Sequence, residues 1–178
     1  MKSRYLSIND NNFLKPTKSY IRETIFNVIK INKNMTSLDL FSGSGILSAE
    51  ALSRGIKESI LIENNKKSFV KIKSEYSILG IESYQIFEID VLKYLSNNKE
   101  LKHDLIFIDP PYDSDLLEKS IMMLDELNYL SKNTYLYYEQ RKKDYNQGLV
   151  SIVTKTHNIL KDLNIGDVSY TIAKIKEN

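Results

Sequence analysis

The stretch TSLDLFSGSGILSAEALSRG, residues 36–55, decides the fold. Its first six residues (36–41) are typical of a β-strand, a glycine-rich turn follows, and residues 46–54 are predicted as a helix that ends at Gly55. ESILIE (58–63) predicts the next strand. A strand, a helix and a second strand in this order predict a right-handed crossover between two parallel strands.

The same alternation continues on both sides of this stretch. SYIRETIFNVIKI (19–31) carries apolar residues at helical spacing and follows Thr17, a candidate N-cap. Further helices are predicted at 66–79, 91–98 and 116–127, and further strands at 83–90, 103–109 and 134–140. The end of the chain differs, because SIVTKTHNI (151–159) and DVSYTIAKI (167–175) predict an antiparallel hairpin. We therefore expect an α/β fold with a mostly parallel, seven-stranded sheet, layered by helices and closed by an antiparallel C-terminal hairpin.

Composition limits the class of protein. The 178 residues are 42% hydrophobic and 27% charged, which is ordinary for one globular domain. No apolar run approaches the roughly 20 residues of a membrane span, and the first residues lack the apolar core of a signal peptide, so we expect a cytoplasmic protein without a membrane partner. The chain has no cysteine, and neither His103 nor His157 has a second histidine at ligand spacing, so we expect no metal.

Basic residues are concentrated near the N-terminus. Residues 1–33 hold seven basic side chains and two acidic ones, a local charge of +5 in a chain whose net charge is +2. This segment could bind the phosphates of a nucleic acid, or it could reflect the abundance of lysine throughout the chain. We divide the chain into a basic segment with its helix packed on the core (1–33) and a single further domain (34–178).

In parallel α/β sheets, ligands bind at the carboxyl ends of the strands, near the point where the strand order reverses. Gly43 and Gly45 lie at one such end, where glycines permit positive φ and close approach of a ligand to the backbone. Turn geometry alone could also explain them. Glu63 ends the next strand, where a carboxylate can accept hydrogen bonds from a ribose diol. This pair suits either a nicotinamide cofactor or S-adenosylmethionine.

The third strand end, DLIFIDPPY (104–112), favours methyl transfer. Two prolines make a stiff corner after Asp109. The nitrogen of an exocyclic base amine is a poor nucleophile because its lone pair is conjugated with the ring. The Asp109 carboxylate and the Pro110 carbonyl could accept its two N–H groups and direct the lone pair toward a methyl donor, while Tyr112 could stack on the base.

With these motifs, the sequence resembles the RsmD-type methyltransferases, which modify the N2 amine of a guanine in small-subunit (16S) ribosomal RNA. The resemblance rests on LDLFSGSGILSAEALSRG (38–55), ILIE (60–63) and DLIFIDPPY (104–112), and extends to LKPTKSYIRETIFN (14–27), YLYYEQR and GDVSY. It implies a Rossmann-like class I methyltransferase fold, S-adenosylmethionine as cofactor, and ribosomal RNA or a small-subunit assembly intermediate as partner. We expect a monomer.

The resemblance also implies residue roles. Catalysis would involve Asp109, Pro110 and Tyr112. The cofactor would contact Asp39, Phe41, Gly43, Gly45, Glu63 and Asp90. RNA would contact Lys15, Thr17, Lys18, Arg22 and Pro111. Asp90 could equally cap the helix that follows it, and Arg22 with Glu23 could form a surface ion pair. Lys15 stands where the family usually has arginine, which removes a bidentate fork.

Other functions fit the same residues. A DNA adenine-N6 methyltransferase would use the same Asp-Pro-Pro-Tyr corner on a base turned out of its helix, although such enzymes normally carry additional mass for target recognition. A non-catalytic RNA-binding assembly factor could retain the fold, but Gly43, Gly45, Glu63 and Asp109 are all present. A nicotinamide oxidoreductase is disfavoured because no residue for hydride chemistry stands out.

Overall fold

A seven-stranded sheet with the strand order β3-β2-β1-β4-β5-β7-β6 forms the centre of the protein. The computed structural model describes residues 19–144 and 147–176. The strands are β1 (Thr36–Asp39), β2 (Glu58–Ile62), β3 (Tyr84–Phe87), β4 (Leu105–Ile108), β5 (Tyr135–Arg141), β6 (His157–Ile165) and β7 (Val168–Ile175). The helices are α1 (Ser19–Val28), α2 (Ile46–Ser53), α3 (Lys66–Leu79), α4 (Val91–Asn97), α5 (Leu116–Glu126) and α6 (Gln147–Thr156), with a 3₁₀ turn at Lys142–Asp144.

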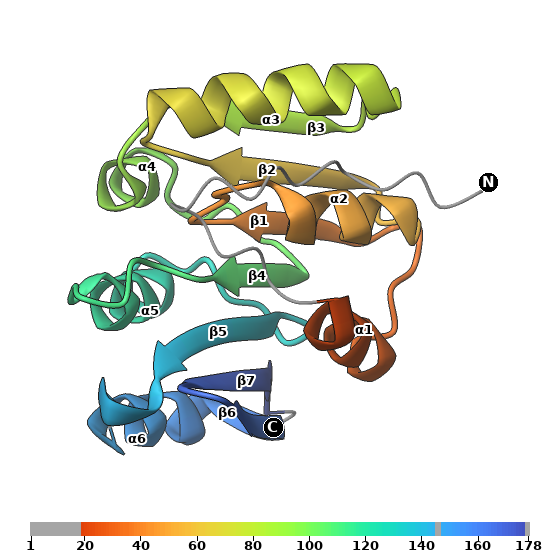
Figure 1. Cartoon of the computed structure of the whole chain (residues 1–178). Coiled ribbons are helices and arrows are strands. Elements are labelled where there is room, and N and C mark those ends of the chain that lie inside the picture. The colour runs from red at the N-terminus through yellow and green to blue at the C-terminus, as the bar shows by residue number, and fades with distance from the viewer. Residues whose placement is uncertain (1–18, 145–146, 177–178) are drawn as a thin grey trace.

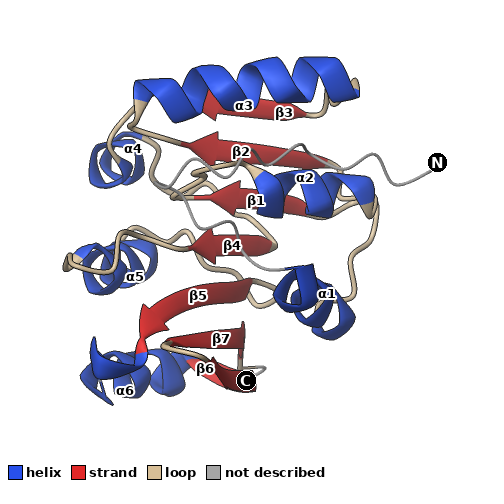
Figure 2. Cartoon of the chain, in the orientation of Figure 1, coloured by secondary structure: helices blue, strands red, loops and turns tan. Residues whose placement is uncertain are grey.

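The strand order reverses between β1 and β4. The chain runs outward from β1 through β2 to β3 and then returns to place β4 on the other side of β1 (Figure 1). The strands β1 to β5 are parallel, whereas β7 pairs antiparallel with both β5 and β6. The predicted parallel sheet with an antiparallel edge is therefore confirmed, and the carboxyl ends of β1, β2, β4 and β5 lie along one edge of the sheet (Figure 2).

Helices cover both faces of the sheet. Alternate residues of β4 point to opposite faces: Leu105 and Phe107 pack in the cluster with α1 and α2, while Ile106 and Ile108 pack in the cluster with α4, α5 and α6. A third cluster joins α2 and α3 over β2. All four β4 side chains are buried, as a central parallel strand requires, so the position of the residue that follows β4 is tightly fixed.

The predicted hairpin is correct in topology but wrong at its first strand. Residues 151–156, predicted as strand, belong to α6, and β6 begins only at His157. The β-branched residues of SIVTKT favour a strand locally. Leu149 and Val153, one helical turn apart, are both buried in the core, so packing against the sheet overrides this propensity. At the other end of the chain, α1 ends at Val28 and not at 31 as predicted.

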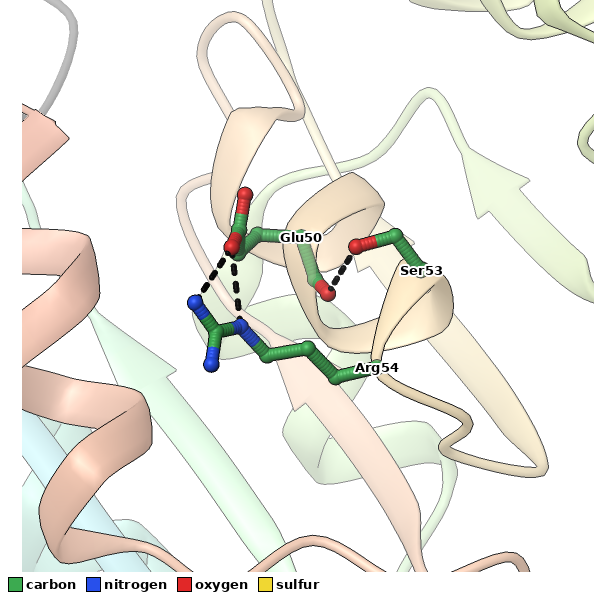
Figure 3. Close-up of polar contacts among 3 residues, drawn as sticks. All are labelled: Glu50, Ser53 and Arg54. Atoms are coloured by element: carbon green, nitrogen blue, oxygen red, sulfur yellow. Dashed lines mark hydrogen bonds and ion pairs between the residues drawn. The ribbon is translucent and has the colours of Figure 1, made fainter. Parts of the chain in front are cut away.

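The conspicuous EALSRG sequence has a structural role at the end of α2. The Glu50 carboxylate accepts hydrogen bonds from Arg54, whose Nε and Nη2 lie 2.8 Å from Glu50 Oε1, and Ser53 Oγ donates to the Glu50 carbonyl at 2.8 Å (Figure 3). The Arg54 guanidinium also lies 4.9 Å from the centre of the Phe26 ring on α1. The contact between Arg54 and Phe26 connects α2 to α1, and this group of residues lies apart from the strand ends described below.

The segment before β1 is described only from residue 19 onward. Ile21 and Ile25 of α1 are buried against the sheet, so this helix is packed on the core. The boundary at residue 33 stays a prediction. Among the residues that the structure describes, no helix has the length and apolar character needed to cross a membrane.

Candidate active site

Four acidic side chains lie at the carboxyl edge of the sheet. Asp39 is the last residue of β1, Glu63 follows β2, Asp109 follows β4, and Glu139 lies near the end of β5. Because neighbouring parallel strands are only about 4.8 Å apart, these carboxyl groups share one region next to the point where the strand order reverses.

The glycine loop after β1 has the backbone geometry that its sequence predicts. Gly43 and Gly45 have φ values of +53° and +73°, a region that residues with a Cβ rarely adopt. Ser42 Oγ donates to the carbonyls of Asp39 and Ile62, both at 3.1 Å, and thereby ties the loop to β1 and β2. A Cβ on Gly45 would lie 3.1 Å from the Tyr76 hydroxyl, so the Tyr76 side chain of α3 packs closely against the loop.

Glu63 holds the glycine loop from the neighbouring strand. Its Oε2 accepts a hydrogen bond from the Gly43 N–H at 2.7 Å, and its Oε1 accepts one from the Asn65 N–H at 2.7 Å. Burial raises the pKa of Glu63, while the backbone hydrogen bonds from Asn65 and Gly43 act in the opposite direction. A carboxylate can accept about four hydrogen bonds, so Glu63 can hold the loop and accept from a ligand hydroxyl together.

Asp39 lies beneath the loop and is 2% exposed. Ser48 Oγ, from the first turns of α2, donates to Asp39 Oδ2 at 2.9 Å. Burial raises the pKa of Asp39 to about 7; the Ser48 hydrogen bond lowers the pKa and the nearby Glu63 charge raises it further. Phe41, two residues on, is half-buried and packs against the core.

The Asp-Pro-Pro-Tyr corner follows β4 directly. Pro110 is buried, Pro111 is exposed, and Tyr112 is half-buried. The Tyr112 hydroxyl donates to Glu139 Oε2 at 3.3 Å, and the Arg141 guanidinium lies 5.1 Å from the centre of the Tyr112 ring. The corner is thus connected to the end of β5 by two contacts of one aromatic side chain.

The carboxyl group of Asp109 is in an unfavourable place for a charge. Burial raises its pKa well above the ordinary value, and the neighbouring charges of Glu139 and Asp39 raise it further. Like charges in a shared low-dielectric site disfavour each other's ionised forms. Strongly shifted pKa values in a cleft are typical of functional sites.

A pocket of about 80 Å³ opens beside the corner. Its walls come from the corner itself, the end of β5 and the helices α5 and α6: Pro110, Pro111, Tyr112, Ser114, Leu117, Glu139, Gln140, Arg141 and Leu149. In the described part of the chain no group of three or more histidine, aspartate or glutamate side chains is arranged to hold a metal ion.

The structure brings most of the predicted site residues to this edge of the sheet. The predicted cofactor residues lie in the glycine loop or next to it: Asp39, Phe41, Gly43, Gly45 and Glu63. The corner consists of Asp109, Pro110, Pro111 and Tyr112.

The remaining predicted residues lie elsewhere or outside the described residues. The exposed Asp90 caps α4, its Oδ1 accepting from the Lys93 N–H at 3.0 Å. Arg22 is half-buried on α1. The predictions for Lys15, Thr17 and Lys18 fall outside the described residues.

Sequence reasoning missed Glu139, Ser48 and Tyr76. Tyr76 on α3 donates a 2.6 Å hydrogen bond to the Gly45 carbonyl, a contact 31 residues apart in sequence that no local pattern reveals. Glu139 could have been found, because β4 and β5 were both predicted as parallel strands and an acidic residue in an apolar run, YLYYEQ, is conspicuous.

Comparison with known proteins identifies relatives over nearly the whole chain. The profile of the family described as "Conserved hypothetical protein 95" matches residues 1–174. Ribosomal RNA small subunit methyltransferase D of Buchnera aphidicola is 39% identical over 144 residues, which make up 80% of this chain and 75% of that protein. The protein of that name from Haemophilus influenzae is 31% identical over 175 residues, 96% of this chain and 88% of its own.

A solved structure agrees with the fold. The crystal structure of a putative methylase from Haemophilus influenzae is 31% identical in sequence and superposes with a TM-score of 0.77. The superposition covers 89% of this chain and 98% of the methylase chain. The predicted Rossmann-like methyltransferase fold is therefore confirmed.

Proposed function

Because this chain belongs to the family of ribosomal RNA small subunit methyltransferase D, we propose that it transfers a methyl group from S-adenosylmethionine to the exocyclic N2 amine of a guanine in small-subunit (16S) ribosomal RNA. The observation that carries this proposal is the position of the Asp109 corner. It follows a fully buried strand, directly beside the strand that ends in the glycine loop.

The residues around the glycine loop fit S-adenosylmethionine. Gly43 and Gly45 both have positive φ, and the absence of a Cβ at each lets a ligand approach the loop backbone closely. Asp39, Phe41, Gly43 and Gly45 would hold the methionine end of the cofactor, Glu63 its ribose, and Asp90 its adenine. When bound, the cofactor supplies a methyl group activated by a sulfonium charge.

The residues of the corner act on the amine. The Asp109 carboxylate and the Pro110 carbonyl accept the two N–H groups of the guanine amine, and these two hydrogen bonds orient the nitrogen lone pair. The ring of Tyr112 stacks on the base face, a contact worth about 1–3 kcal/mol. Transfer would form the new N–C bond as the methyl–sulfur bond breaks and leaves a neutral thioether, and the nitrogen must lose a proton. Asp109, whose pKa is raised by burial and by Glu139, is suited to accept that proton.

Recognition of the RNA involves a different part of the chain. Lys15, Thr17, Lys18, Arg22 and Pro111 contact the RNA, with the basic segment attracting its phosphates. The partner is free ribosomal RNA or a small-subunit assembly intermediate, and the protein works as a cytoplasmic monomer without a metal.

Product analysis tests the proposal. The protein is incubated with tritiated S-adenosylmethionine and, separately, with ribosomal RNA, small subunits, transfer RNA and DNA, and the labelled nucleoside is identified. We expect N2-methylguanosine from ribosomal RNA or small subunits. Label in N6-methyladenosine from DNA, or no transfer to any pool, would exclude the proposal.

A further inference from the structure

We propose that Glu139 selects guanine by accepting a hydrogen bond from the base N1–H, beside the amine that Asp109 holds. This inference rests on the proposed function and adds the residue that distinguishes guanine from the other bases carrying an exocyclic amine.

The strand register places Glu139 next to Asp109. Ile108 of β4 is paired with Tyr138 of β5, so the next residues of the two parallel strands, Asp109 and Glu139, lie side by side. They also point to the same face of the sheet, because each follows by two residues a side chain of the same core cluster, Phe107 and Tyr137. Glu139 and Pro110 line the same pocket.

Phenol groups fix the orientation of the Glu139 carboxylate. The Tyr137 hydroxyl donates to Oε1 at 2.6 Å and the Tyr112 hydroxyl donates to Oε2 at 3.3 Å, while Tyr170 is its cross-strand partner on β7. Glu139 is 4% exposed. A carboxylate can accept about four hydrogen bonds, enough for two phenols and one base N–H together.

The chemistry of the base edge then determines which base fits. In guanine, the ring nitrogen beside the exocyclic amine, N1, carries a hydrogen and donates. In adenine and cytosine, the corresponding ring nitrogens, N1 and N3, are acceptors. A carboxylate at this position pairs with guanine but faces a lone pair in adenine or cytosine. Sites that are built to form a buried hydrogen bond strongly reject analogues that cannot form it.

The test compares guanine with 2-aminopurine, which keeps the amine at C2 but has no hydrogen on N1. Each base is placed at the methylated position of ribosomal RNA, joined from a transcript and a synthetic segment and assembled into subunits where the enzyme requires them. Wild-type protein is expected to prefer guanine in kcat/KM by at least tenfold, as for one hydrogen bond to a charged group.

Two substitutions isolate the contribution of Glu139. Glu139→Gln removes the charge. Glu139→Met removes both acceptor oxygens while keeping a side chain of similar length. The preference should fall to an intermediate value in the first variant and to within about threefold of unity in the second. Any indirect effect of either change on Asp109 alters transfer to both bases equally and cancels in the ratio. Tyr137→Phe, which removes one orienting phenol, should reduce the preference partially.

The outcomes separate this inference from the proposed function. Glu126→Gln, on the exposed end of α5, is the control and should keep the wild-type preference. If wild-type protein methylates guanine but the preference is unchanged in both Glu139 variants, the role of Glu139 is overturned while the proposed function stands. If wild-type protein methylates no guanine, both are overturned. Thermal unfolding of each variant verifies that it is folded.

Discussion

Three carboxyl groups, those of Asp39, Asp109 and Glu139, converge at one edge of the sheet, and this arrangement costs stability. The pKa of Asp39 rises to about 7, chiefly through burial, and that of Asp109 rises well above its ordinary value. Folding normally avoids burying like charges together. Their presence at the strand ends therefore indicates a function that needs hydrogen-bond acceptors there.

The role of Glu63 leads to a prediction about cofactor affinity. Glu63→Ala removes the proposed acceptor for the ribose, and it removes the hydrogen bond from the Gly43 N–H. The dissociation constant for S-adenosylmethionine should rise about tenfold to a hundredfold, as for loss of roughly 1.5–3 kcal/mol, measured by calorimetric titration. Glu58→Ala, at the opposite end of β2 where it accepts from Gln85, is the matched control. Equal affinity in the Glu63 variant would contradict this role.

The raised pKa of Asp109 predicts how methyl transfer depends on pH. In the proposed mechanism Asp109 takes up the amine proton, which only its ionised form can do. The value of kcat/KM should therefore climb with pH to a half-maximum well above the ordinary aspartate pKa of 3.8. The groups facing it are Glu139 and Asp39 and the tyrosines 112, 137 and 170, whose own raised pKa values keep them neutral. Glu139→Gln removes one charge and should move the half-maximum to lower pH. A flat profile from pH 4.5 upward would contradict the assignment.

At the scale of elements, the sequence predicts β4 and its corner well and α6 poorly. The apolar run LIFI predicts a buried strand. The two prolines after Asp109 predict its end, because a proline has no N–H to donate to the hydrogen bonds of a sheet. The segment SIVTKT has no such constraint. Its β-branched residues favour a strand, and only the burial of Leu149 and Val153 reveals a helix.

The support of the glycine loop by α3 is likewise invisible in the sequence, and it predicts a mutational effect. Tyr76→Phe deletes the 2.6 Å hydrogen bond to the Gly45 carbonyl. The free energy of unfolding should fall by about 1 kcal/mol in urea titrations, and the affinity for S-adenosylmethionine should fall several-fold because the loop loses its fixed position.

A matched variant separates these two effects. Tyr129→Phe deletes a similar buried hydrogen bond, from the Tyr129 hydroxyl to the Leu95 carbonyl at 2.9 Å, away from the loop. It should cost similar stability and leave cofactor affinity unchanged. If both variants bind the cofactor equally well, α3 does not position the loop.

At the scale of the whole molecule, the alternation of strands and helices is sufficient to predict the fold class. The rule that parallel strands end at one edge is sufficient to predict that the glycine loop, Glu63 and Asp109 lie near one another. The contacts of Glu139 were not predicted, because they depend on the register between β4 and β5. Register follows from packing over the whole sheet and not from any one segment. The basic segment, residues 1–33, adds a local charge of +5 to this molecule.

Stability of the whole molecule should depend on pH through His103. This side chain is buried before β4, and neither ring nitrogen has a hydrogen-bond partner among the described residues. Burial lowers its pKa from 6.5 to about 4. The unfolded chain therefore binds the proton first as pH falls, and the contribution of neutral His103, roughly 3 kcal/mol at most, is lost between pH 6.5 and 4.

The difference between wild-type protein and His103→Gln isolates this contribution. Asp39, whose pKa is raised, gives the opposite slope in both proteins, so it cancels in the comparison. Urea titrations from pH 4 to 7 should show a wild-type free energy of unfolding that falls more steeply toward low pH than that of the variant. Parallel curves would contradict the prediction.

The central claim is that the Asp109 corner acts on the amine and not on the cofactor. Asp109→Ala removes both acceptor oxygens of the side chain, so residue 109 can no longer hold an amine hydrogen. Single-turnover methyl transfer to the RNA substrate should slow at least about a hundredfold, while the dissociation constant for S-adenosylmethionine stays within about threefold of the wild-type value. A variant that transfers the methyl group at the wild-type rate would contradict the account.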